Sequence, residues 1–123
     1  MTGRVQGALR GLTVSRAEFE ASQERRRALR SGCCPVAEVP DRRRATVAGV
    51  LRSVTLRSRQ TVPALEAELF DGTGALRLVW LGRREIPGVH PGRRLRVAGT
   101  ISREGGTATL YNPRYELLSD GEA

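Results

Sequence analysis

The chain has 123 residues, which is enough for one domain with a modest hydrophobic core, and it carries 21 basic residues, all of them arginine, against 13 acidic ones. The net charge of +8 favours a polyanionic partner, and nucleic acid rather than an anionic membrane, because no apolar anchor accompanies the charge. No segment approaches the roughly 18 consecutive apolar residues of a membrane-spanning helix, and the N-terminus lacks the apolar centre of a signal peptide, so we expect a cytoplasmic protein without membrane insertion.

Residues 1–44 are expected to form a basic N-terminal arm outside the folded body. Ser15 is a candidate N-cap and Glu18 stands in the capping-box position, so we predict a helix over about 15–30. The apolar residues of this helix do not form a continuous stripe, which favours a solvated helix or one that docks on a partner protein. The arm also contains a loosely held start with three glycines, residues 1–12, and an extended linker, residues 35–40.

Residues 45–118 have the pattern of a small all-β domain, followed by an acidic tail at 119–123. The expected strands cover 45–54, 64–70, 75–81, 93–101 and 107–111, the last resuming at 115–118 after Asn112-Pro113; the polar segment 57–61 is expected to form a loop, and 82–89 a short connector. Asp71-Gly72 supplies the residues that a tight hairpin needs between the second and third strands. Gly49, inside the first strand, indicates a sharp bend or a close approach of another backbone.

Five short strands with brief connections favour a small, strongly curved sheet that closes on itself. Six motifs carry a family resemblance: Val47-Ala48-Gly49-Val50-Leu51, Asp71-Gly72-Thr73-Gly74, Leu76-Arg77-Leu78-Val79-Trp80, Pro91-Gly92, Val97-Ala98-Gly99 and Asn112-Pro113-Arg114-Tyr115-Glu116. In their order and spacing, residues 47–118 resemble the nucleic-acid-binding oligonucleotide/oligosaccharide-binding (OB) family, which includes the anticodon-binding domain of class II aminoacyl-tRNA synthetases and the wedge domain of RecG-type helicases. The resemblance is to a stand-alone bacterial OB-domain protein, and it implies a five-stranded OB-fold Greek-key barrel that binds nucleic acid.

Strand phase indicates which side chains of the third strand could touch a ligand. With the leucines of this strand pointing inward, Arg77 and Val79 point outward over the face on which the OB family binds nucleic acid. Arg77 is therefore either a nucleic-acid contact or the ion-pair partner of Glu66 or Glu68, whose carboxylates disfavour phosphate on the same face. Trp80 shares the inward phase, which favours a core position over base stacking.

The other candidate contacts are arginines at strand ends, in loops and on the outward face of the strand at 93–101, and one ring that could stack on a base. Together with Arg77 they are Arg52, Arg57, Arg59, Arg83, Arg84, Arg94, Arg96, Tyr111 and Arg114. Any single arginine among them could instead be a solvated surface side chain. Because aromatic residues make up only 4% of the chain, phosphate contacts would dominate, and binding would depend strongly on salt and weakly on sequence. The arginine triplets at 25–27 and 42–44 would either add phosphate contacts or serve only solubility.

The sequence offers no support for catalysis, a cofactor or a metal site. His90 is the single histidine, and Cys33 and Cys34 are adjacent, without the C-x-x-C spacing of a metal site. Adjacent cysteines rarely form a disulfide because its geometry would be strained, which favours a reducing compartment. Asp71 is expected to be a turn-forming residue whose carboxylate accepts hydrogen bonds from nearby backbone N–H groups, and not a catalytic acid.

The sequence therefore predicts a non-enzymatic OB-fold protein that binds single-stranded DNA or RNA with little sequence specificity. The alternative is an OB-fold adaptor for protein–protein interaction that docks through its N-terminal helix. Carboxylates on the expected binding face and the small number of aromatic rings favour this alternative.

Overall fold

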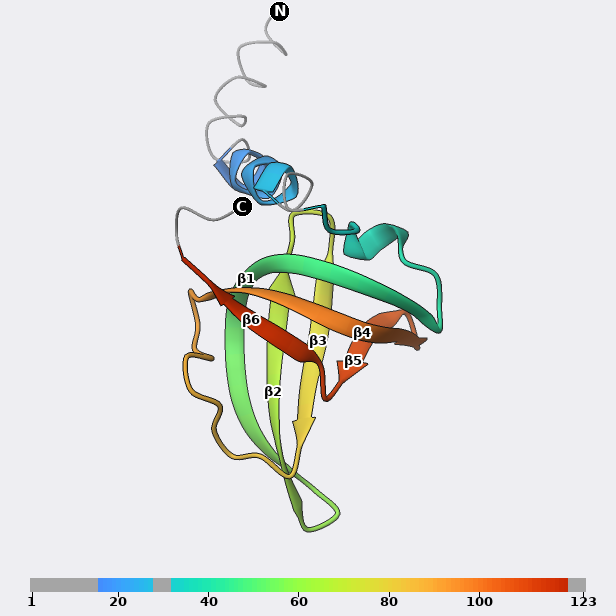
Figure 1. The fold of residues 1–123 in the computed structure, drawn as a ribbon, viewed down its shortest axis with the longest axis vertical. Helices are drawn as coiled ribbons and strands as arrows, with labels where there is room; N and C mark the ends of the chain where they lie inside the picture. The colour runs from blue at the N-terminus through green and yellow to red at the C-terminus, as the bar shows by residue number, and fades with distance from the viewer. Residues whose placement is uncertain (1–15, 28–31, 120–123) are drawn as a thin grey trace, which may run out of the picture.

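The computed structural model describes residues 16–27 and 32–119, and of Arg59 only the backbone (Figure 1). Residues 16–27 are helical, and a short 3-10 helix, η1, spans Val36–Glu38. The strands are β1 (Arg43–Arg59), β2 (Val62–Phe70), β3 (Ala75–Leu81), β4 (Arg94–Glu104), β5 (Thr107–Tyr111) and β6 (Arg114–Leu118). Within this part of the chain, no helix is long and apolar enough to cross a membrane.

The six strands form one sheet that closes on itself. Their order is β1-β2-β3-β5-β4-β6, and an additional pairing between β1 and β4 closes the sheet into a barrel-like ring (Figure 1). All pairings are antiparallel except that of β3 with β5, which is parallel. This connectivity is consistent with the all-β, OB-like fold that the sequence predicts.

Strand β1 belongs to both halves of the ring, because it is long and because it bends near Gly49. Its first half pairs with β4 and its second half with β2, and the two registers meet at Val50. A Cβ atom at Gly49 would lie 2.2 Å from the carbonyl oxygen of Phe70, so only glycine fits. The predicted close backbone approach at this glycine is confirmed.

The β1–β2 hairpin is longer than the sequence indicates. The polar segment 57–61, expected to be a loop, continues β1 to Arg59, and the turn is reduced to Gln60 and Thr61. Both turn residues have positive φ, at 47° and 70°, in the sense that two-residue hairpin turns require. The usual Asn-Gly signal is absent from this turn, and for that reason the sequence pattern missed it.

The predicted interruption of the last strand is confirmed. β5 and β6 pair with the same side of β4, and the register slips by one residue between them, as the pairs Ile101–Leu110 and Ala98–Arg114 show. Asn112 fills this bulge with a φ of 49°. Its backbone N–H donates to the Val79 carbonyl at 2.6 Å, and its Oδ1 accepts from the Leu81 N–H at 2.9 Å. The interruption thus ties the end of β5 to the end of β3.

The core lies inside the ring and draws on more of the chain than the strands. Val36 and Val39, from the segment predicted to be a linker, are buried in it together with Ile86 of the β3–β4 connector. Trp80 is 5% exposed and packs edge-on against Tyr115, with ring centroids 5.9 Å apart, which confirms its predicted core position. The rigid unit therefore begins before residue 45, and the linker forms part of the folded body.

The helical segment 16–27 docks on the ring, whereas the sequence favours a solvated helix or one that docks on a partner protein. Glu24 is only 9% exposed, and its carboxylate accepts hydrogen bonds from both terminal nitrogens of Arg94, one at 2.9 Å. The same segment packs against the β2–β3 turn, where a Cβ on Gly72 would lie 2.1 Å from the carbonyl oxygen of Ala21. The helix is attached by a buried ion pair and a close backbone contact. Neither of these can be detected by searching the sequence for an apolar stripe.

A second attachment fastens the segment before β1, and it depends on an arginine that was not among the predicted functional residues. The Arg103 guanidinium donates to the carbonyl oxygens of Val36 and Val39, the latter at 2.7 Å, and its backbone N–H donates to the Asp41 carboxylate at 2.7 Å.

Some predictions lie outside the described residues: the start at 1–12, the Ser15 cap, the end of the helix at 28–30 and the acidic tail beyond Ser119.

Candidate nucleic-acid interface

The outward side chains of β1, β2, β3 and β5 form one continuous surface, which we call the outer face. The strand registers arrange it in rows that cross the strands. The rows are Ser53–Glu68–Arg77–Thr109, then Thr55–Glu66–Val79–Tyr111, then Arg57–Ala64–Leu81. A bulge between Leu51 and Ser53 sets this phase, because strict alternation from Leu51 would turn Ser53 inward.

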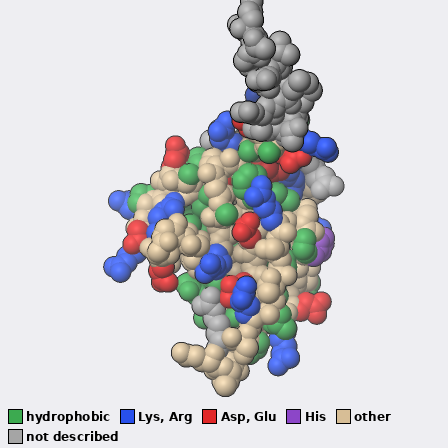
Figure 2. All heavy atoms as spheres, turned by 180° about the vertical axis from the view of Figure 1, so that it is seen from behind, with side chains coloured by type: hydrophobic (Ala, Val, Ile, Leu, Met, Phe, Trp, Pro, Cys, Tyr) green, Lys and Arg blue, Asp and Glu red, His purple; other side chains and the backbone are tan. Residues whose placement is uncertain are grey.

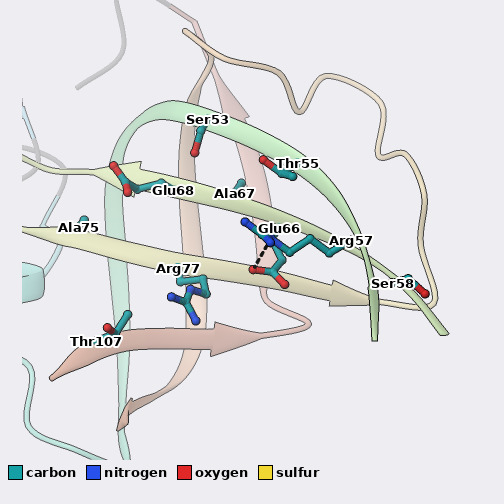
Figure 3. A pocket seen from close by; sticks show the side chains of 10 residues that line it. All are labelled: Ser53, Thr55, Arg57, Ser58, Glu66, Ala67, Glu68, Ala75, Arg77 and Thr107. Carbon is teal, nitrogen blue, oxygen red and sulfur yellow. Dashed lines mark ion pairs between the residues drawn. The ribbon is translucent and has the colours of Figure 1, made fainter. Parts of the chain in front are cut away.

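A groove with a volume of about 540 Å³ is hollowed into the outer face (Figure 3). Its lining comes from four strands and is mostly polar. The lining residues are Ser53, Thr55, Arg57, Ser58, Glu66, Ala67, Glu68, Ala75, Arg77 and Thr107. Two guanidinium groups and two carboxylates face each other here among hydroxyls, so the formal charges of the groove balance.

The two arginines of the groove differ in their partners. The Nε atom of Arg57 lies 3.7 Å from Oε1 of Glu66, the ion pair drawn in Figure 3. Arg77 is exposed and stands directly opposite Glu68 in the β2–β3 pairing. Within residues 16–27 and 32–119, neither Arg77 nor Glu68 forms an ion pair or a side-chain hydrogen bond. The guanidinium of Arg77 is therefore available to a ligand, and its predicted ion-pair alternative is not realised among these residues.

Aromatic rings lie on the outer face on both sides of the Glu68–Arg77 pair. Tyr111 is 39% exposed and adjoins Val79 in the neighbouring row, at the position predicted for a stacking ring. Phe70, half-buried, points outward in phase with Glu68, and the Arg52 guanidinium carbon lies 3.5 Å from the centre of its ring. Phe70 was not among the predicted contacts, although its alternation with the two glutamates of β2 is a usable signal.

Val79 does not contribute exposed surface, although the phase of β3 directs it outward as predicted. It is in register with Tyr111 but has no exposed surface, so it forms part of the floor of the outer face. Leu81, the next outward residue of β3, is 42% exposed. The outer face therefore passes from a polar groove to an apolar floor along β3.

Several predicted contacts lie elsewhere. The prediction that Arg94 is a surface contact is wrong, because the helix covers this side chain and Glu24 neutralises its charge. Arg96 and Arg114 point outward from the other half of the sheet, where Arg96 donates to Glu116 at 2.6 Å. This hydrogen bond raises the pKa of Arg96. The remaining predicted arginines are Arg83 and Arg84, exposed in the β3–β4 connector, and Arg59, whose backbone pairs with Val62 beside the groove.

Positive charge is dispersed on the side of the molecule seen in Figure 2. Basic and acidic side chains alternate there and do not gather into one continuous basic surface. On this side, the arginines therefore act singly and not as one basic patch.

Asp71 and the two cysteines, whose side chains could take part in chemistry, do not line the groove. The buried carboxylate of Asp71 accepts hydrogen bonds from the backbone N–H groups of Val36, Thr73 and Gly74 at 2.8, 2.9 and 3.1 Å, which confirms it as a turn-forming residue. Cys33 and Cys34 form no disulfide within the described residues, and burial raises the pKa of the Cys33 thiol. In the described part of the chain, no group of three or more His, Cys, Asp or Glu residues could hold a metal ion.

Comparison with protein-family models finds no match, and comparison with curated protein sequences finds none either. Among solved structures, the chain is similar to one from the structure of RecG bound to a three-way DNA junction. The two are 22% identical, with a TM-score of 0.49. The similarity covers 66% of this chain and 12% of the RecG chain, so this protein spans only a small part of that neighbour's length.

Proposed function

We propose that this protein is a non-enzymatic OB-fold module that binds single-stranded DNA or RNA across the outer face. The observation that carries the proposal is the groove of about 540 Å³ that crosses four strands and presents the guanidinium of Arg77, which is unpaired among the described residues. An extended strand of nucleic acid needs such an open surface, with a cation for its phosphates and rings for its bases.

Tyr111 and the Arg52–Phe70 pair supply the stacking surfaces that this mode of binding uses. Because the groove has as many carboxylates as guanidinium groups, we expect moderate affinity, carried mainly by phosphate contacts and by the diffuse positive charge.

The test is a fluorescence-polarisation titration with labelled single-stranded DNA and RNA at two salt concentrations. With about three phosphate contacts, the dissociation constant should rise about 20-fold between about 50 and 200 mM salt. The absence of binding at micromolar protein in low salt would refute the proposal. A dissociation constant that does not change with salt concentration would refute the expectation that phosphate contacts dominate binding.

The second candidate is a protein-interaction adaptor that docks through the helix at 16–27. Phe19 on this helix is 61% exposed, and this observation favours a protein contact there. A pull-down after nuclease treatment separates the two functions: an adaptor keeps its partner, whereas a nucleic-acid-binding module loses whatever the nucleic acid had tethered.

A further inference from the structure

Glu68 occupies a position that binding to phosphate alone does not explain. It lies in the groove, half-buried and directly opposite Arg77 across the β2–β3 pairing. A carboxylate beside a phosphate-binding guanidinium would repel the ligand, unless it contacts a different part of it. Bases, unlike phosphates, carry hydrogen-bond donors.

The neighbouring carboxylate is already committed and cannot take this role. Glu66 is only 12% exposed in its side chain, and its Oε1 lies 3.7 Å from Nε of Arg57. Glu68 and Arg77 instead have no ion pair or side-chain hydrogen bond within the described residues, and Figure 3 shows that the two side chains do not point toward each other. An acceptor and a donor thus extend from directly paired positions of β2 and β3 in the groove lining, each with unused hydrogen-bonding capacity.

This pair matches the edges of some bases and not of others. Cytosine presents an amino donor beside ring-nitrogen and carbonyl acceptors, so a carboxylate can accept from the amino group while a guanidinium donates to the acceptors. Guanine offers the reverse order, with amino and imino donors for the carboxylate and a carbonyl for the guanidinium. Adenine, like cytosine, presents an amino donor beside a ring-nitrogen acceptor. Thymine and uracil have no amino group on this edge: their one imino donor lies between two carbonyl oxygens, so a carboxylate that accepts from it is repelled by the carbonyl oxygens on both sides.

We propose that Glu68 and Arg77 recognise the Watson–Crick edge of one unpaired base and favour bases with an amino group on that edge, such as cytosine, over thymine or uracil. The proposal rests on the proposed function, because it assigns a base preference to the same groove. Unpaired bases in single strands expose this edge, which duplexes hide. The exposed hydroxyl side chain of Ser53, opposite Glu68 on β1, extends the same polar row.

The experiment compares homopolymeric dC and dT oligonucleotides of equal length at mildly alkaline pH, where cytosine stays neutral. The two strands have the same charge and similar size, so phosphate contacts cancel in the comparison. A single charge-assisted hydrogen bond that forms with cytosine but not with thymine should make dC binding about tenfold tighter for the wild-type protein.

The variant Glu68→Gln should remove this contrast, mainly by strengthening dT binding, because an amide can donate to the thymine carbonyl. The matched control Glu85→Gln makes the same charge change in the exposed β3–β4 connector outside the groove, and it should shift both affinities equally. Equal affinity of the wild-type protein for dC and dT would overturn the inference. A difference between dC and dT affinity that persists in Glu68→Gln would overturn it too, and both outcomes leave the proposed function intact. Failure to bind these two DNA strands and the corresponding RNA strands, rC and rU, overturns the proposed function itself.

Discussion

Replacing Asp71 by alanine should lower the free energy of unfolding by about 3 kcal/mol, because the backbone N–H groups of Val36, Thr73 and Gly74 lose their acceptor. Asp71 is 1% exposed, so water cannot easily replace the carboxylate. The loss has two parts: the β2–β3 turn loses the hydrogen bonds that Thr73 and Gly74 donate to this carboxylate, and η1 loses the one that Val36 donates to it. The hydrogen bond from the Ala37 N–H to Thr73 Oγ1 still connects η1 to the turn. Urea denaturation followed by circular dichroism measures the change.

The matched control for this prediction is Asp71→Asn. Asparagine keeps one carbonyl acceptor and the same shape, so it should retain a substantial part of the stability that alanine loses. A decrease below about 1 kcal/mol for Asp71→Ala would contradict the role assigned to this carboxylate.

Replacing Arg77 by alanine should weaken single-stranded nucleic-acid binding about tenfold, the value expected for one charge-assisted hydrogen bond. If Arg77 contacts a phosphate as well as a base, the slope of log affinity against log salt should also become shallower by about 0.7. Polarisation titrations across a salt series give both quantities. The thermal stability of the variant should be unchanged, since Arg77 is exposed and unpaired among the described residues.

Arg114→Ala is the control for the binding prediction. Arg114 is also exposed on a strand, but it points outward from the half of the sheet formed by β1, β4 and β6. Its removal takes away the same charge without altering the groove, so it should change affinity only slightly. If Arg114→Ala weakens binding as much as Arg77→Ala, the outer face of β1, β2, β3 and β5 is not the interface.

The sequence was informative where structure depends on local chemistry. Asp71-Gly72 defined the β2–β3 hairpin, Gly49 marked the close approach to Phe70, and Asn112-Pro113 marked the bulge between β5 and β6. Each of these residues acts through its own backbone geometry or through hydrogen bonds to near neighbours. Such constraints leave a trace in the sequence itself.

Contacts between distant parts of the chain were not predictable in the same way. Arg94 donates a hydrogen bond to Glu24 although the two residues lie 70 positions apart in the sequence. The helix also has no apolar stripe from which its docking could be predicted. Val36 and Val39 looked like linker residues, because periodicity does not show that Arg103 holds this segment on the core. The bulge between Leu51 and Ser53 in β1 also reverses the alternation, so the phase of the following residues depends on pairing with β2.

Binding of nucleic acid in the groove is tested most directly by mapping which backbone amides respond when a short single-stranded oligonucleotide is titrated into the isotopically labelled protein. The largest changes in amide chemical shift should follow the outer face, with Arg77, Tyr111 and Glu68 among the residues most affected. Changes confined to the helix at 16–27, or to the outward side of β4 and β6, would contradict the claim that the groove binds nucleic acid.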